Sequence, residues 1–148
     1  MSRIAFRQMT KEDIDYVYDV DKRSFVTPWP KDIYYEEMTR NQYARYFVAT
    51  VDQQVVGFCG TWMVIDEAQI TNIAIDPAYR GRQLGTGLFQ YVMNEAIANG
   101  VKRLSLEVRV SNVVAQRMYK KFGLVPGGIR KNYYVDNHED ALVLWVNL

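Results

Sequence analysis

Apolar residues along the chain follow two spacings, one typical of helices and one typical of strands. Four segments repeat apolar positions every three or four residues, and shorter segments between them alternate or are apolar throughout. Capping residues, Pro and Gly mark the expected helix ends. We expect helices from a capping box at 10–13 to about 25, over 31–40, from the glycine-rich segment 80–87 to 98, and over 112–122 with Ser111 as cap. We expect strands at 4–7, 45–51, 55–64, 69–75, 102–110, 127–135 and 141–147.

The strand, helix and strand within residues 70–110 decide the fold class. Such a succession favours a right-handed crossover, which makes the two strands parallel neighbours in the middle of a sheet. The sequence therefore predicts an α/β fold with a mixed, mostly antiparallel central sheet, a central parallel strand pair and about four flanking helices. Ligands in such sheets bind at the carboxyl ends of the parallel strands, which is where segment 80–87 follows.

Length and composition fit one globular domain. The chain has 148 residues, 49% of them apolar, so it can build a hydrophobic core, and we expect a single domain over residues 1–148. A net charge of +1 gives no general attraction to nucleic acid or to a membrane surface. The first residues contain no long apolar run, so we expect neither a signal peptide nor a membrane span, and a cytoplasmic location.

The single cysteine and the single histidine carry no expected chemistry. Cys59 excludes an internal disulfide and a cysteine-based metal cage, and its neighbours Phe58 and Trp62 favour a buried thiol over a nucleophile. His138 lies in the polar segment 136–139, which favours a solvated turn. A lone histidine cannot hold a metal by itself, and we expect no metal cofactor.

The segment from Arg80 to Gly87 is the strongest candidate for a binding site. Its glycines let the main chain approach a bulky anion, and the helix that follows directs free N–H groups and its positive dipole end to the same place. The spacing fits neither the dinucleotide fingerprint nor the P-loop, which needs a lysine. On these residues alone, a pyrophosphate site and a glycine-rich turn without a ligand remain equally open.

The strand Leu104 to Val110 supplies the candidate acid. Its period of two places apolar residues on one face and Ser105, Glu107 and Arg109 on the other. Polar residues on a central strand suggest that this face opens to a cleft, because strands covered on both faces are usually apolar throughout. A solvated or ion-paired sheet surface would give the same pattern.

The glycine-rich segment also matches the pattern Arg/Gln-x-x-Gly-x-Gly/Ala, and in this it resembles the acetyl-CoA pyrophosphate loop of the GNAT acetyltransferases. Further motifs, in the same order along nearly the whole chain, resemble the bacterial ribosomal-protein-alanine N-acetyltransferases of the RimI type within that family. They are Pro28-Trp29, Asn72-Ile73-Ala74-Ile75-Asp76-Pro77, Leu106-Glu107-Val108-Arg109, Ser111-Asn112, Tyr119, Phe122-Gly123, Arg130-Lys131-Asn132-Tyr133-Tyr134 and Glu139-Asp140-Ala141. Related archaeal and eukaryotic N-terminal acetyltransferases share several of them.

The resemblance implies a role for each group of residues. Glu107 would accept the proton of the amine, directly or through water, and Tyr119 would protonate the departing CoA thiolate. Trp29, Tyr133 and Tyr134 would contact the acceptor. Asn112 would anchor the cofactor arm, although beside Ser111 it could equally cap a helix. The full set of cofactor-binding residues implied is Ile73, Ala74, Ile75, Arg80, Gly81, Arg82, Gln83, Leu84, Gly85, Thr86, Gly87 and Asn112.

The function implied is transfer of an acetyl group from acetyl-CoA to a protein N-terminal amine, that of an alanine on a small-subunit ribosomal protein. The transfer would be direct, because a route through an acyl-enzyme needs an activated nucleophile. Nucleic acid and membranes are not expected partners, and the oligomeric state is not predicted. Two alternatives remain at this stage. The amine could belong to a lysine, a polyamine or a small metabolite, or the protein could be a non-catalytic acyl-CoA sensor.

Overall fold

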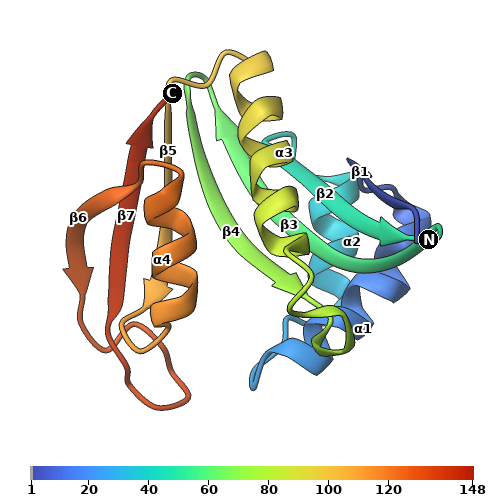
Figure 1. Ribbon diagram of the computed structural model, residues 1–148, viewed down its shortest axis with the longest axis horizontal. Helices are drawn as coiled ribbons and strands as arrows, with labels where there is room; N and C mark the ends of the chain where they lie inside the picture. Colours follow the sequence, from blue (N-terminus) through green and yellow to red (C-terminus); the bar gives the residue numbers. More distant parts are fainter. Residues whose placement is uncertain (1) are drawn as a thin grey trace.

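The computed structural model describes residues 2–148, which form one seven-stranded sheet with helices on both faces (Figure 1). The strand order is β1-β2-β3-β4-β5-β7-β6. The strands are β1 (Ile4–Gln8), β2 (Ala44–Val51), β3 (Gln54–Val64), β4 (Glu67–Ile75), β5 (Arg103–Arg109), β6 (Val125–Arg130) and β7 (Ala141–Asn147). The helices are α1 (Ile14–Ser24), α2 (Lys31–Thr39), α3 (Leu84–Ala98) and α4 (Val113–Lys121), with short 3-10 turns η1 (Lys11–Asp13) and η2 (Pro77–Tyr79).

Two apolar layers hold the helices against the sheet. Helices α3 and α4 cover one face, where Phe89 and Leu88 pack with Leu104 and Leu106 of β5. Helices α1 and α2 cover the other face over β2, β3 and β4, around the fully buried Tyr34. Burying a side chain of this size contributes about 1.5–3 kcal/mol to folding. The predicted α/β class with four flanking helices is confirmed.

The predicted parallel pair exists, but it is short. β4 and β5 pair in parallel only over Glu67–Gln69 and Arg103–Ser105. All other neighbouring strands pair antiparallel. On its other side β4 stays paired with β3 as far as Ile75, so residues 70–75 keep one strand edge without a partner strand. Figure 1 shows β4 and β5 separating from this short paired stretch onward.

The C-terminal part differs from the sequence prediction. The strand expected at 127–135 starts at Val125 and ends at Arg130, and a loop over residues 131–140 connects it to β7. Asn132 and His138 in that loop adopt positive φ of 53° and 60°, which a continuous strand does not allow. Of the two caps that the sequence left open for α4, Asn112 and not Ser111 occupies the N-cap position.

Strand β4 contains an irregularity next to the expected site. The register between β3 and β4 shifts between Gly60 and Thr61, which leaves Thr71 as the extra residue of a bulge. Gly60 is required there, because a Cβ would lie 2.6 Å from both the Asn72 and the Thr71 side-chain oxygens. The bulge therefore brings two polar side chains of β4 against a glycine of β3.

Replacing Gly60 by alanine tests this close approach. We expect the free energy of unfolding to fall by about 1–3 kcal/mol, because the added methyl group has to displace Asn72 and Thr71. Gly85→Ala is the matched control, since a Cβ at that position lies no closer than 3.7 Å to its neighbours. Urea unfolding followed by circular dichroism measures both. Equal stability of the Gly60→Ala protein and the wild type would contradict the bulge geometry.

Candidate active site

The start of α3 presents a group of free main-chain donors. Gly81 and Gln83 adopt positive φ of 80° and 59°, and this turns the chain into the helix at Leu84. Within residues 2–148, the backbone N–H groups of 81–86 donate no hydrogen bond. Free N–H groups at the positive end of a helix dipole bind anions. The loop therefore has the structure expected of a pyrophosphate site.

Two arginines flank this loop. The Arg80 side chain donates from Nε to the main-chain oxygen of Ile75 at 3.2 Å. The Arg82 guanidinium lies 5.1 Å from the centre of the Tyr79 ring. Both arginines are exposed, so their positive charge is available to an anion at the loop.

The loop, the end of β4 and α4 meet at Gly85. A Cβ at this position would lie 3.7 Å from the Ile75 side chain and 3.9 Å from the Met118 sulfur. The unpaired edge of β4 thus leads directly to the glycine-rich segment 80–87, which we call the anion loop. An extended ligand with a phosphate end could add to β4 as a strand does, while the helix start holds its phosphates.

Glu107 lies on the opposite face of the sheet from α3 and α4. Its neighbours Leu106 and Val108 point into the helix-covered core, and Glu107 points away from it. Its side chain is 11% exposed and forms an ion pair with Arg130, with 3.1 Å between Oε1 and Nε. Gln69 of β4 donates from Nε2 to Oε2 at 3.3 Å. The carboxylate is therefore held from both sides, by β4 and by β6.

Arg109 serves a structural purpose on the same face. Its guanidinium pairs with Asp136 at 2.9 Å and with Glu139 at 3.3 Å, and it lies 3.9 Å from the centre of the Tyr134 ring. Hydrogen bonds from Ser111 hold the pKa of Glu139 at about 2, well below its ordinary value. Arg109 therefore holds the loop 131–140 against β5. For Arg109, the alternative of an ion-paired sheet surface, which the sequence left open, is the one observed.

Tyr119 lies on the face of the sheet that α3 and α4 cover. Its ring packs in the core 5.2 Å from Phe89, and only 5% of the residue is exposed. Its hydroxyl makes no hydrogen bond within residues 2–148, and in that part only the Ser24 hydroxyl is both fully buried and without a partner. The Tyr119 oxygen therefore keeps contact with solvent. Burial raises the pKa of Tyr119, so its hydroxyl stays protonated at neutral pH.

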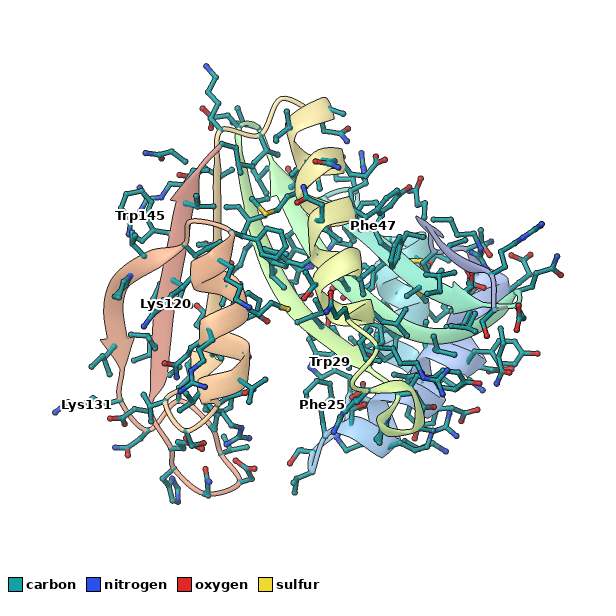
Figure 2. All side chains as sticks on the ribbon, in the orientation of Figure 1. Phe25, Trp29, Phe47, Lys120, Lys131 and Trp145 are labelled. Atoms are coloured by element: carbon teal, nitrogen blue, oxygen red, sulfur yellow. The ribbon has the colours of Figure 1, made fainter. Side chains whose placement is uncertain are left out.

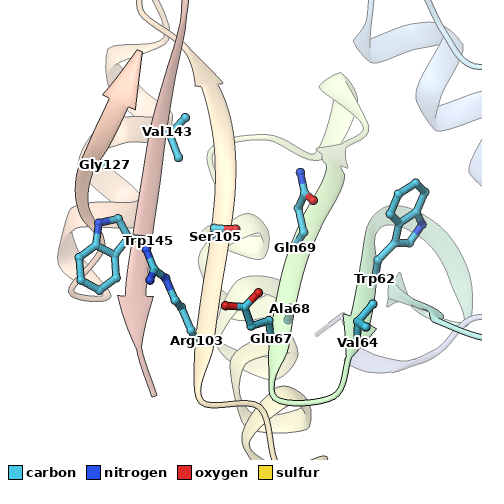
Figure 3. Close-up of a pocket in the computed structure, with 10 residues that line it drawn as sticks. All are labelled: Trp62, Val64, Glu67, Ala68, Gln69, Arg103, Ser105, Gly127, Val143 and Trp145. Carbon is cyan, nitrogen blue, oxygen red and sulfur yellow. The ribbon is translucent and has the colours of Figure 1, made fainter. Parts of the chain in front are cut away.

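A hollow of about 370 Å³ lies on the Glu107 face of the sheet. Figure 3 shows Gln69 of β4 and Ser105 of β5 side by side at its centre, with Trp62 and Trp145 at its sides. Gln69 forms part of the wall and also donates to Glu107. The hollow therefore extends along the sheet from the carboxylate. Its walls are Trp62, Val64, Glu67, Ala68, Gln69, Arg103, Ser105, Gly127, Val143 and Trp145.

The predicted acceptor residues lie on two connections at the same end of the molecule. Figure 2 places Trp29 between α1 and α2 at the end where Lys131 begins the loop 131–140. Tyr133 and Tyr134 belong to that loop rather than to a strand, and their rings pack edge to face at 5.1 Å. Burial and then the charge of Glu107 raise the pKa of Tyr133, which places its phenol near the carboxylate.

Three remaining predictions have different outcomes. The Asn112 side chain accepts from the Ala115 N–H at 3.1 Å as a helix cap, so its role toward a cofactor stays a prediction. Cys59 is fully buried, and burial raises the pKa of its thiol, as expected of an inert cysteine. His138 is exposed in the loop. Sequence reasoning missed Gln69 as a partner of Glu107, because the alternation of β4 indicates the face of Gln69 but not which residue it meets 38 positions away.

The described residues contain neither a cluster of metal-binding side chains nor a membrane-spanning helix. Between Ser2 and Leu148, no three His, Cys, Asp or Glu side chains lie close enough to share a metal ion. No helix in that range has the length and apolar character needed to cross a membrane.

A parallel strand pair that opens beside a helix start with free main-chain donors is the arrangement of an acyl-CoA-dependent N-acyltransferase. The chain belongs to the acetyltransferase (GNAT) family, whose sequence profile matches residues 14–124. Enzymes of this family take their acetyl group from acetyl-CoA. The predicted family, fold and enzyme class are thereby confirmed.

Curated relatives and solved structures agree with this membership. A Bacillus subtilis (strain 168) protein provisionally named ribosomal protein bS18-alanine N-acetyltransferase is 54% identical over 99% of this chain and 97% of its own length. The Escherichia coli (strain K12) protein of that name is 35% identical over 89% of each chain. A crystal structure of the Escherichia coli ribosomal-protein-S18-alanine N-acetyltransferase superposes with a TM-score of 0.89 over 99% of this chain and 94% of that one, at 31% identity. The crystal structure of Ard1 from Thermoplasma volcanium superposes with a TM-score of 0.88 over 98% of this chain and 97% of that one, at 26% identity.

Proposed function

We propose that this chain transfers the acetyl group of acetyl-CoA to the α-amine of the N-terminal alanine of ribosomal protein bS18. The names of the Bacillus subtilis and Escherichia coli relatives support the acceptor. The observation that carries the chemistry is the opening between β4 and β5, with Glu107 on one face of the sheet and Tyr119 on the other. The whole chain acts as one domain, in the cytoplasm and without a metal.

The residues present fit acetyl-CoA, which supplies an activated acetyl thioester when bound. The free N–H groups of 81–86 would hold its diphosphate, with Arg80 and Arg82 adding positive charge. Main-chain groups of Ile73 to Ile75, on the edge of β4 that no strand occupies, would bind the arm and polarise the acetyl oxygen. Gly87 packs against Phe6 and supports the helix behind the loop.

Glu107 would remove the proton that blocks the amine. An N-terminal α-amine has a pKa of about 8, so most of it is protonated at neutral pH, though less than a lysine with a pKa of about 10.4. Arg130 and Gln69 hold the Glu107 carboxylate on the face of the sheet that Tyr133 and Trp29 border. Glu107 accepts the proton at this site, directly or through a water molecule.

Tyr119 would supply the second proton from the other face. Its buried ring fixes the position of the hydroxyl, and its raised pKa keeps a proton on the oxygen. The phenol can therefore donate to the sulfur as the thioester bond breaks. Transfer is direct in this scheme, because the thiol of Cys59 is fully buried and its raised pKa opposes thiolate formation.

A peptide panel tests the acceptor. Purified protein is incubated with acetyl-CoA and peptides that carry the bS18 N-terminal sequence with alanine, serine, methionine or a pre-acetylated residue at position one. We expect acetylation of the alanine peptide at its α-amine, at least about tenfold faster than of the others. Mass spectrometry with fragmentation locates the acetyl group. Acetylation of lysine side chains alone, or of spermidine in a parallel reaction, would refute the proposed acceptor.

Glu107→Gln tests the base. We expect kcat/KM to fall by roughly 100-fold or more at pH 7. The loss should shrink toward pH 9, where the free amine is abundant, and acetyl-CoA affinity in calorimetry should stay the same. Glu67→Gln is the control, because Glu67 lines the hollow next to Glu107 and has no ion pair in the described part. A pH-independent loss of activity would contradict proton abstraction by Glu107.

Tyr119→Phe tests the proton donor. We expect kcat to fall by roughly 10-fold to 100-fold with an unchanged melting temperature, because the phenylalanine ring keeps the contact with Phe89. Tyr91→Phe is the matched control, since Tyr91 packs against Phe6 and Phe47 away from the opening. Full activity of the Tyr119→Phe protein would assign the proton to another group.

A further inference from the structure

A buried carboxylate holds the connection between α1 and α2. We call residues 25–30, which include Trp29, the acceptor loop. Asp21 of α1 is 1% exposed, and its Oδ2 accepts from the Trp29 main-chain N–H at 3.1 Å. The same oxygen accepts from the Tyr34 hydroxyl at 2.5 Å. One carboxylate oxygen of α1 thus joins the acceptor loop to α2.

Tyr34 extends this connection to the sheet. Its hydroxyl donates to Asp21 and accepts from Asn72 Nδ2 at 3.1 Å. Its ring is fully buried and packs against Trp29 at 5.6 Å and edge to face against Phe58 at 5.8 Å. Tyr34 therefore cannot shift without moving both the acceptor loop and a side chain of β4.

Asn72 occupies a particular position in β4. It follows the bulge residue Thr71 and precedes Ile73, where the strand edge without a partner strand begins to serve the proposed cofactor arm. The Thr71 hydroxyl donates to Asn72 Oδ1 at 3.1 Å, and Gly60 leaves the space that both side chains need. The Asn72 amide is thus fixed at both of its polar ends.

Packing alone does not account for this arrangement. No cation pairs with Asp21 in residues 2–148, and burying a carboxylate without one is costly. Burial raises the pKa of Asp21, and the hydrogen bonds from Tyr34 and Trp29 oppose that rise. An apolar residue would fill the same space with a smaller desolvation penalty. The buried polar groups therefore fix the geometry of this region rather than add to the stability of the fold.

We propose that Asp21 and Tyr34 are positioning residues for acetyl transfer, because their hydrogen bonds to Trp29 and Asn72 hold the acceptor loop in a fixed position relative to the edge of β4. The inference rests on the proposed function of that loop and that edge. It follows that the amine and the acetyl group are brought together by two elements that share one hydrogen-bond chain. Asp21 and Tyr34 lie outside the main-chain donors of the anion loop, and β3 holds the main chain of β4 as far as Ile75, so we expect the cofactor affinity to change little without them.

Tyr34→Phe removes the hydroxyl at the centre of the hydrogen-bond chain that joins Trp29, Asp21 and Asn72. Tyr35→Phe is the control, because Tyr35 is exposed on the same helix. For Tyr34→Phe we expect KM for the bS18 N-terminal peptide to rise by about tenfold and kcat to fall, with acetyl-CoA affinity within twofold of wild type. A role in stability alone would lower the active fraction without raising KM. Wild-type KM and kcat in the Tyr34→Phe protein would overturn the proposal.

Rescue at Asp21 gives a second readout. Asp21→Asn keeps an oxygen that can accept from both Trp29 and Tyr34, so we expect KM within about threefold of wild type. Asp21→Leu removes that oxygen and should match or exceed the Tyr34→Phe effect, and Asp19→Asn on the exposed side of α1 is the control. Equal KM in the Asn and Leu variants would overturn the proposal.

Hydrogen exchange separates this inference from the proposed function. In Asp21→Leu the amide proton of Trp29, which loses its acceptor, should exchange about tenfold faster than in wild type, while those of α3 stay unchanged. This measurement needs no acceptor, so it holds even if wild-type protein fails to acetylate any peptide, a result that would refute only the proposed function. Unchanged exchange in the acceptor loop would overturn the positioning role.

Discussion

The site depends on the small number of hydrogen bonds between two central strands. β4 and β5 pair over three residues each and then separate, although both strands continue. Main-chain N–H and C=O groups in a protein interior need partners, and a strand edge that no strand occupies leaves such groups open. Because β3 pairs with β4 on its other side, the open edge keeps the conformation of a strand. The fold thus prepares a strand-shaped position that only an extended molecule can fill.

Glu107 and Tyr119, the two residues predicted to transfer protons, lie on opposite faces of the sheet in different surroundings. Glu107 lies among charged residues, with Arg130 beside it and Arg109 two residues further along β5. Tyr119 lies in an apolar layer, where burial raises its pKa. One face of the sheet therefore surrounds a carboxylate with charged side chains, and the other keeps a phenol neutral.

The sequence predicted those parts of the site that depend on local patterns. The glycine spacing at 80–87 and the alternation in β5 indicated the anion loop and the face of Glu107, and both features are present. Residues 131–135 were misread as strand, because Arg109 fixes the loop that contains them from a position 27–30 residues away. Gln69 with Glu107 and Asn72 with Tyr34 are each 38 residues apart, and no local pattern encodes such pairs. The catalytic and cofactor roles of individual residues stay predictions.

The last strand of the sheet has a consequence for how the molecule meets other chains. β6 contains Pro126, which has no N–H, and a break in register before Gly128 at φ 144°. An outer strand with these features is a poor template for a neighbouring polypeptide, which protects an exposed sheet border from aggregation. An incoming extended segment therefore finds its best complement inside the molecule, at the border of β4, and not at this rim.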